Sequence, residues 1–236
     1  MRPASRRRVS WWQVLVFAFI SSLFYQLMFM KGITLTTAGN TALIMAAMPM
    51  WTAVLNLIFV RERLLAITWF GLVVTFLGTV IVTVQDGKIS FSSEFLLGNL
   101  YILCASIAWA GGTVMSRPML DSITPLRLAF YSSLVCLPFH FLIASSEISQ
   151  SWAQALEPSV LAAIVFSGVF STGLAYAAWH YGVRQLGASH AAVYQNAVTL
   201  VAVLGGWLWV GEQPLLSQIL GGALIIAGLL MMRKGR

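Results

Sequence analysis

An internal repeat constrains this chain more than any other feature of its sequence. The stretch Gly32–Gly78 aligns without a gap on Gly182–Gly228, at an offset of 150 residues. Each copy has the end of one apolar segment, a turn, a second apolar segment, an acidic turn and a third apolar segment with spaced glycines. Identical pairs include Gly32 and Gly182, Ala38 and Ala188, Ala42 and Ala192, Glu62 and Glu212, Gly71 and Gly221, and Gly78 and Gly228. Self-similarity over this length predicts a fold made of two related halves.

Composition places both halves in a membrane. Of the 236 residues, 59% are hydrophobic and 9% are charged, whereas soluble domains carry about 25% charged residues. Only helices and closed barrels satisfy their own backbone in lipid, so the apolar segments predict an all-α polytopic membrane protein. The net charge of +7 does not predict nucleic-acid binding, because the basic residues stand at segment ends. Cys104 and Cys136 lie inside apolar segments and are interpreted as small buried side chains.

The hydropathy pattern predicts eight transmembrane helices. The first, Trp11–Met30, is long enough to cross a bilayer at about 1.5 Å per residue. A signal peptide is the alternative, but the apolar run is too long, and Tyr25–Ile33 pairs through the repeat with a later span. The other predicted spans are Ala38–Phe59, Ile67–Val84, Leu97–Met115, Leu126–Ala144, Val160–Tyr181, Ala188–Val210 and Gln218–Met232. The two longer connections are Gln85–Phe95 and Ser145–Pro158.

The distribution of basic residues predicts orientation. Alternate loops place 12 of the 14 Lys and Arg residues on one side, with only Lys31 and Lys88 on the other. The arginine-rich side is expected to be cytoplasmic. The chain is therefore predicted to span a bacterial inner (plasma) membrane with both termini in the cytoplasm. Glu62 then falls in an inner turn and its repeat partner Glu212 in an outer turn. The two repeats are therefore predicted to have inverted topology, as in many transporters.

The predicted organisation is a partial first repeat of three helices (1–85), a loop (86–96), a complete second repeat of five helices (97–232) and a basic cytoplasmic tail (233–236). Inversion requires an odd number of helices in each repeat, which three and five both satisfy. The counterparts of Leu97–Ala144 would precede Met1. A miscalled start, a truncated gene and a genuine eight-helix protein are all left open by the sequence.

A family resemblance rests on two motifs of the second repeat. Gly187-Ala188-Ser189-His190-Ala191-Ala192 is followed by an apolar span to Trp209-Val210-Gly211-Glu212 and then by the glycine-spaced segment Leu220–Gly228. This pattern resembles the EamA-type domain of the drug/metabolite transporter superfamily, and it recurs weakly in the first repeat. The resemblance implies ten helices and the export of amino acids, other metabolites or drugs. The chain departs from the pattern in lacking the first two helices and in having Thr199 where the first repeat has Pro49.

No catalytic constellation is present. The sequence has no HExxH, no GxSxG and no glycine-rich phosphate loop, and all seven acidic residues lie in loops or at helix ends. An intramembrane enzyme is therefore disfavoured, and no metal or cofactor is expected. Neutral polar side chains in the apolar segments remain as candidates for substrate binding.

The first candidate group is spaced four residues apart on one helix. Thr172, Tyr176 and His180 share a face, and His180 is the near-central residue that could change charge between pH 5 and 8. Their repeat partners are Ser22, Gln26 and Met30. Two of the three positions are polar in both copies, so the two faces are predicted to oppose each other across a central cavity. Hydrogen bonding between helices is the alternative explanation.

The second candidate group lies on the following span. Gln195 and Thr199 share a helix face with Asn196 beside them, and amides at this depth must face protein or water. Pro49, the repeat partner of Thr199, is expected to break its own helix near the centre. Trp109 is predicted to form an aromatic wall of the site, with core packing as its alternative.

Together these features predict a secondary transporter that exports a small metabolite or amino acid by alternating access. The expected partners are a small-molecule substrate and the lipid bilayer, with a homodimer left open. The predicted substrate-binding residues are Gln26, Trp109, Thr172, Tyr176, His180, Gln195, Asn196 and Thr199. The alternative is a transport-incompetent fragment, or a subunit that functions only after assembly.

Overall fold

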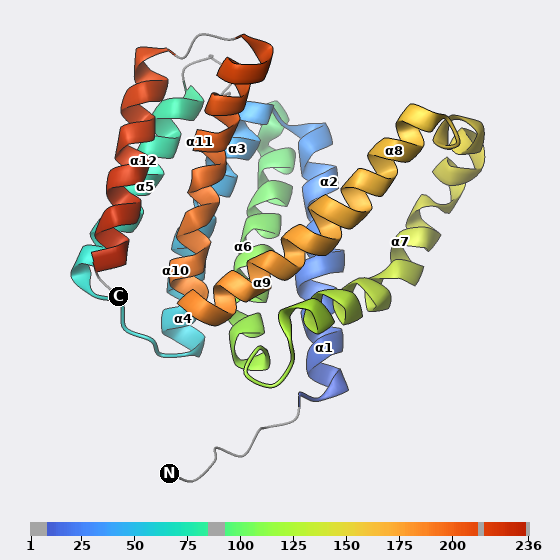
Figure 1. Ribbon diagram of the computed structural model, residues 1–236, viewed down its shortest axis with the longest axis horizontal. Helices are drawn as coiled ribbons and strands as arrows, with labels where there is room; N and C mark the ends of the chain where they lie inside the picture. The colour runs from blue at the N-terminus through green and yellow to red at the C-terminus, as the bar shows by residue number, and fades with distance from the viewer. Residues whose placement is uncertain (1–8, 85–92, 212–214, 235–236) are drawn as a thin grey trace.

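The structure is a computed structural model that describes residues 9–84, 93–211 and 215–234, and in these ranges the regular structure is entirely helical (Figure 1). The first repeat contains α1 (Trp11–Ala18), η1 (Phe19–Phe24), α2 (Tyr25–Leu35), α3 (Ala38–Ala46), α4 (Met48–Phe59) and α5 (Ala66–Val84). The second contains η2 (Ser93–Phe95), α6 (Leu96–Met119), α7 (Pro125–Ala155), α8 (Pro158–Phe166), η3 (Ser167–Leu174), α9 (Ala175–Leu186), α10 (Ala188–Val193), η4 (Tyr194–Asn196), α11 (Ala197–Gly205), η5 (Gly206–Val210) and α12 (Leu216–Lys234).

Seven helical segments of the described chain are long and apolar enough to cross a membrane, one fewer than the eight expected. They are Trp11–Leu35, Ala38–Phe59, Leu96–Met119, Pro125–Ser145, Pro158–Leu186, Ala188–Trp209 and Leu216–Lys234. The eighth expected span corresponds to α5, whose apolar part, Ala66–Val82, is shorter. Helix α5 starts at Ala66, one residue before the expected start and after a non-helical stretch from Arg61 to Leu65, and it ends at Val84 as expected.

The connection expected at Ser145–Pro158 differs more clearly. Helix α7 starts at Pro125, where the Thr124 side chain caps it by accepting from the Arg127 backbone N–H, and it continues to Ala155. Most of the expected loop is therefore helix. The segment is polar enough to be interpreted as a loop, but helical hydrogen bonding continues through it to Ala155. Between Ser145 and Glu157 there is no proline to interrupt the helix.

The repeat is reproduced element by element. Helices α5 and α12 have bounds that differ by 150 residues at both ends, and so do the starts of α2 and α9 and of α3 and α10. Each repeat also widens from α-helix to π-helix at the same place, in η1 and in η3. The two copies therefore share their local irregularities as well as their helices.

The two copies point in opposite directions through the membrane (Figure 1). In that view α1–α2 and α5 run upward and α3–α4 downward, whereas α8–α9 and α12 run downward and α10–α11 upward. The inverted topology predicted from the sequence is thus the observed one. The predicted inversion places Glu62 and Glu212 at opposite ends of the bundle. Glu212 lies outside the described residues, but α11 ends and α12 begins at the end opposite the turn between α4 and α5 (Figure 1).

The central break predicted at Pro49 is present, and it is present in both repeats. Helix α3 ends at Ala46 and α4 starts at Met48, with Pro49 in its first turn. The repeat partner of the linking residue Ala47 is Ala197, which follows the short 3₁₀ turn η4. The second repeat makes its break without a proline, so the interruption belongs to the repeated fold.

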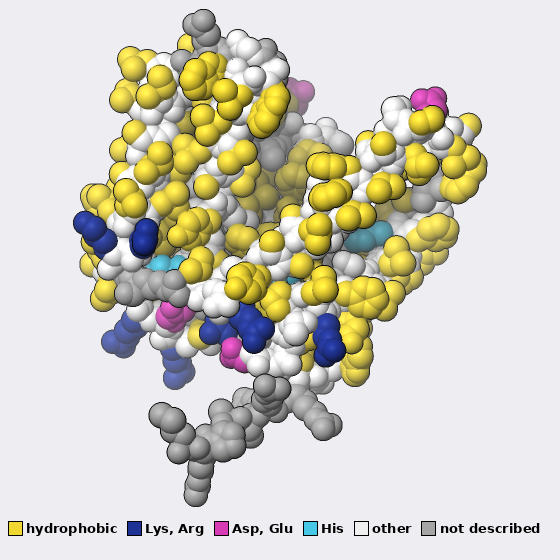
Figure 2. Space-filling view, viewed as in Figure 1, with side chains coloured by type: hydrophobic (Ala, Val, Ile, Leu, Met, Phe, Trp, Pro, Cys, Tyr) yellow, Lys and Arg dark blue, Asp and Glu magenta, His cyan; other side chains and the backbone are white. Residues whose placement is uncertain are grey.

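Basic side chains gather at one end of the molecule (Figure 2). The same end holds the largest buried apolar cluster, which includes Val14, Phe17, Leu120, Leu128 and Val183. This cluster joins α1, α6, α7 and α9 and closes the bundle toward the arginine-rich end.

Candidate functional site

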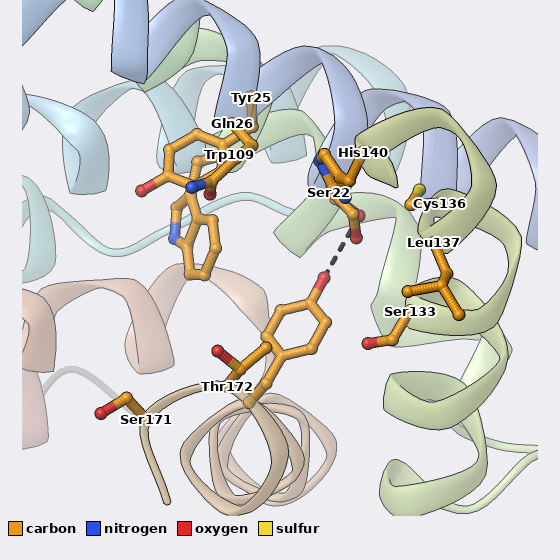
Figure 3. Close-up of a pocket in the computed structure, with 12 residues that line it drawn as sticks. Ser22, Tyr25, Gln26, Trp109, Ser133, Cys136, Leu137, His140, Ser171 and Thr172 are labelled. Atoms are coloured by element: carbon orange, nitrogen blue, oxygen red, sulfur yellow. Dashed lines mark hydrogen bonds between the residues drawn. The ribbon is translucent and has the colours of Figure 1, made fainter. Parts of the chain in front are cut away.

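A cavity of about 480 Å³ lies between the first and second repeats. The apolar cluster separates it from the arginine-rich end. Its walls come from η1 and α2 of the first repeat and from α6, α7, η3 and α9 of the second (Figure 3). The lining residues are Ser21, Ser22, Tyr25, Gln26, Trp109, Ser133, Cys136, Leu137, His140, Ser171, Thr172 and Tyr176. Figure 2 shows the surface hollowed between the α7–α8 arm and the rest of the molecule.

Each repeat contributes a pair of neighbouring hydroxyl groups to this cavity. Ser21 and Ser22 lie in η1, while Ser171 and Thr172 lie at the corresponding positions of η3. A π-helical turn changes the direction of the side chains that follow it and is frequent at functional sites. The cavity is therefore walled by the same irregular element from both copies.

One hydrogen bond joins the two repeats across the cavity. The hydroxyl oxygens of Ser21 and Tyr176 are 3.3 Å apart (dashed line in Figure 3). Ser21 also donates to the carbonyl oxygen of Phe17 at 2.7 Å. With that donor committed to its own helix, the Ser21 oxygen is placed to accept a hydrogen bond from the Tyr176 hydroxyl.

Aromatic rings form the opposite wall. The ring of Trp109 lies 4.9 Å from that of Tyr25, 6.0 Å from Tyr176 and 5.9 Å from Trp179, measured between centroids. The Trp109 indole Nε1 is buried and has no hydrogen-bond partner among the described residues. Buried indole N–H groups usually have a partner, so this donor is available to a ligand.

His180 does not line the cavity; it lies between the cavity residue Tyr176 and Phe17 of the apolar cluster. Its ring is 4.5 Å from that of Tyr176 and 5.6 Å from that of Phe17, in edge-to-face geometry, and its side chain is buried. Both ring nitrogens lack a hydrogen-bond partner among the described residues. His180 therefore forms part of the floor that separates the cavity from the arginine-rich end.

The structure separates the eight predicted residues into three groups. Those that line the cavity are Gln26, Trp109, Thr172 and Tyr176. His180 contacts it from below. Those that do not line it are Gln195, Asn196 and Thr199, which lie in η4 and α11, and η4 packs against α5. The opposed faces of η1–α2 and η3–α9, predicted from the repeat, do meet across one cavity.

Several lining residues were not among the candidates from sequence. Tyr25, Ser133 and His140 are examples, and the buried Nε2 of His140 has no hydrogen-bond partner among the described residues. The hydroxyl pairs of η1 and η3 could have been found, because hydroxyl residues occupy both positions in both copies. Nothing in the local sequence marks His140, since α7 reaches the cavity only through tertiary packing, and Tyr25 in α2 has the apolar Ala175 as its repeat partner.

The cavity surface is mostly apolar, with a few hydroxyl, amide and imidazole groups, and its lining residues include no Asp, Glu, Lys or Arg. Within the described ranges no group of three His, Cys, Asp or Glu side chains is placed to hold a metal ion. The chemistry that the site offers is hydrogen bonding by hydroxyl, amide and imidazole groups beside aromatic faces. Such a site can bind a small molecule reversibly.

The comparison with known families agrees with this geometry. Residues 2–84 and 96–234 match the EamA-like transporter family. The chain belongs to this family. The two matched ranges correspond to the two inverted repeats, and the family resemblance found in the sequence is confirmed.

Curated relatives in this family include transporters of bacteria and archaea. An uncharacterized transporter, YyaM, of Bacillus subtilis (strain 168) is 28% identical over 221 residues, covering 92% of this chain and 71% of the relative. An uncharacterized transporter of Archaeoglobus fulgidus is 24% identical and covers 90% of this chain and 74% of the relative. A probable terminal-alkyne amino-acid exporter of Streptantibioticus cattleyicolor is 23% identical over 89% of this chain and 69% of the relative.

A solved structure shares the fold. A crystal structure of another protein superimposes with a TM-score of 0.75 at 21% sequence identity, covering 98% of this chain and 78% of that chain. This likeness establishes the fold of the EamA-like chain. It carries no information about the substrate.

Proposed function

We propose that this membrane protein is a secondary transporter that exports a small, net-uncharged metabolite or amino acid from the bacterial cytoplasm. The observation that carries the proposal is the cavity enclosed by the same π-helical hydroxyl pairs from two inverted repeats. Transporters of inverted-repeat architecture bind substrate near the midplane at the repeat interface. Both termini are proposed to lie in the cytoplasm of an inner (plasma) membrane, because the basic end is the inner end.

The chemistry of the lining supports the substrate class. A substrate with net charge would need a counter-charge to enter a low-dielectric site, and the lining residues provide none. A neutral or zwitterionic molecule can use Ser22, Gln26 and Thr172 for hydrogen bonds. Its apolar part would pack against Trp109 and Tyr25. The amino-acid exporter among the relatives supports amino acids as the first class to test.

The proposed mechanism is alternating access, with one repeat moving against the other around this cavity. In the present arrangement the apolar cluster around Phe17 and Val183 closes the basic end. In this state the substrate would be released toward the side of the membrane opposite the basic end. Loading from the cytoplasm would require the cluster to separate between α1 and α9 while α5 and α12 remain packed.

The test is flux of radiolabelled amino acids into inside-out membrane vesicles that contain the purified chain. Saturable uptake that falls in Thr172→Val is expected, because Thr172 lines the cavity. Gln195→Ala serves as the matched control, since Gln195 is polar and at similar depth but does not line the cavity. An equal loss in both variants, with both stably inserted, would remove the cavity as the substrate site.

One observation favours a second function, that of a subunit active only after assembly. None of the described side chains of α8 and η3 is buried, which is unusual for helices that wall a transport site. Stable insertion with no flux for any amino acid tested would support this alternative.

A further inference from the structure

A second cavity, of about 220 Å³, lies at the arginine-rich end of the bundle, where the end of α12 approaches α9 and α10. Three of its lining side chains, His190, Tyr194 and Arg233, carry hydrogen-bond donors. The remaining lining side chains are the apolar ones of Leu186, Val193, Leu229 and Met232. Basic and histidine side chains gather at this end of α10 and α12 (Figure 2). We call this space the basic cavity.

The basic cavity is suited to an anion. Arg233 carries a fixed positive charge, and none of the described residues that line the cavity is acidic. Glu62 belongs to the same end of the molecule, but its carboxylate accepts a hydrogen bond from Asn56 and it does not line the cavity. An anion would therefore meet one guanidinium group and two further donors. Guanidinium groups bind phosphate oxygens in bidentate geometry.

An apolar groove of about 760 Å³ lies between α11 and α12, which run side by side (Figure 1). On α12 it is lined by Ile219, Gly222 and Ile226, and these are followed at helical spacing by Leu229 and Arg233 of the basic cavity. Residues three and four apart share a helix face. One face of α12 therefore runs from the groove into the basic cavity.

The length of this face matches a membrane lipid. The ten residue steps from Ala223, which lines the groove, to Arg233 span about 15 Å of helix. This is about half of the hydrocarbon core of a bilayer, and therefore the length of one acyl chain in its leaflet. A lipid with its phosphate at Arg233 would place an acyl chain along the groove as far as Ala223.

The groove side of α12 is also loosely closed. The close backbone contacts of α12 are with α5, through Gly221 and Gly228. Toward α11, a methyl group added at Gly222 would meet only the Cδ2 atom of Leu200, at 3.1 Å. Side-chain ends rather than helix backbone close this side, so the groove can admit a flexible chain.

We propose that the basic cavity and the groove together bind one anionic phospholipid from the leaflet at the arginine-rich end. His190, Tyr194 and Arg233 bind its phosphate, and one acyl chain lies between α11 and α12. Basic pockets between transmembrane helices bind anionic headgroups in this way. A soluble phosphate would offer the same charge, but the groove that continues from the cavity favours a ligand with an acyl chain. This site shares no lining residue with the cavity proposed for transport.

The experiment measures lipid binding to the purified full chain in a neutral detergent. The delipidated protein is titrated with phosphatidylglycerol or with phosphatidylcholine of the same acyl chains, and native mass spectrometry counts the bound lipids. One phosphatidylglycerol per chain is expected to bind about tenfold more tightly than phosphatidylcholine, because only the former has a net negative charge to pair with Arg233. Glycerol 3-phosphate, which has no acyl chain, is expected to compete only weakly.

Two pairs of variants locate the site. Arg233→Gln should weaken phosphatidylglycerol binding about tenfold, the effect of one lost charged hydrogen bond. Its control is Arg184→Gln, since Arg184 is an exposed arginine at the same end that does not line the basic cavity. Ala223→Trp should fill the groove and also weaken binding. Leu230→Trp, at an exposed position of α12 outside the groove, should leave it unchanged.

Four outcomes overturn the proposal. Equal binding of the two lipids would remove the headgroup site. No loss in Arg233→Gln, or an equal loss in Arg184→Gln, would mean that lipid is attracted to the basic end as a whole. Competition by glycerol 3-phosphate as strong as that by the lipid would identify a soluble phosphate as the ligand. Unchanged binding in Ala223→Trp would exclude the groove. None of these readouts depends on transport activity.

Discussion

Gly71 of α5 lies directly against Gly228 of α12, and a methyl group at Gly71 would come within 2.8 Å of the Gly228 carbonyl oxygen. Seven residues along, Gly78 stands in the same relationship to Gly221, at 2.7 Å. The last helices of the two repeats therefore pack backbone to backbone along an antiparallel seam. Because each contact is the repeat image of the other, this seam defines the axis that relates the two halves.

Filling this seam should destabilise the protein. Gly71→Val is expected to lower the free energy of unfolding by about 1–3 kcal/mol, the usual cost of overpacking, because one of the two nearest obstructing atoms is the Gly228 carbonyl oxygen of the backbone. The apparent melting temperature in detergent measures the effect. Gly111→Ala is the control, since its nearest neighbour is the Leu55 Cδ1 atom at 4.0 Å. Equal shifts in both variants would contradict the seam.

Removing the Tyr176 hydroxyl should weaken transport without unfolding the protein. Ser21 keeps its bond to the Phe17 carbonyl, so within the protein Tyr176→Phe loses only the link across the cavity. We expect the Tyr176 hydroxyl to bind the substrate as well, because Tyr176 lines the cavity. Loss of one neutral hydrogen bond to the substrate, about 1 kcal/mol, corresponds to about a fivefold rise in the KM for uptake. Tyr181→Phe, on the exposed side of the same helix, should leave KM unchanged. An unaltered KM in Tyr176→Phe would exclude this hydroxyl from substrate binding.

A buried amide joins the two repeats near the arginine-rich end. Asn56 of α4 donates to the Ser189 Oγ of α10 at 2.9 Å and also to the Glu62 carboxylate. A double-mutant cycle of Asn56→Ala and Ser189→Ala should give a coupling of about 0.6 kcal/mol, within the range for polar contacts in membranes. Thermal unfolding of the four proteins measures it. Ser145→Ala, which breaks a bond within one helix, replaces Ser189→Ala in the control cycle and should show no coupling with Asn56→Ala.

The inversion can be checked by labelling. Leu65 and Leu215 are repeat partners just before α5 and α12, and both are exposed. Leu65→Cys should react with a membrane-impermeant maleimide from the cytoplasmic side only, and Leu215→Cys from the outer side only. Reaction of both from one side would falsify the inverted arrangement and the alternating-access mechanism with it.

The sequence was most informative where the repeat carried the information. The inverted topology followed from the 150-residue offset together with the placement of Lys and Arg, and the opposed faces bearing Gln26 and Tyr176 followed from the offset. The break before Pro49 followed from the proline itself. The count of eight differs by one from the seven membrane-length helices of the described residues, although α5 covers the predicted eighth span. The Ser145–Pro158 loop was wrong because hydropathy measures apolarity over a window, whereas the helical hydrogen bonding of α7 continues to Ala155.

The residues of the candidate site were also predicted only in part from the sequence. A polar residue in an apolar span must face protein or water, which singled out Gln195 and Tyr176 alike. Only packing against α6 and α7 decides that Tyr176 reaches the cavity while Gln195 lies in η4 near α5. His140 was missed for the same reason.

The sequence by itself determined that this chain is a helical membrane protein of two inverted halves, because hydropathy, charge placement and the repeat are properties of each segment in turn. The tertiary structure decided which faces meet. That outcome depends on how closely glycine-bearing helices approach and where π-turns redirect their side chains, and both are set by neighbours distant in the chain.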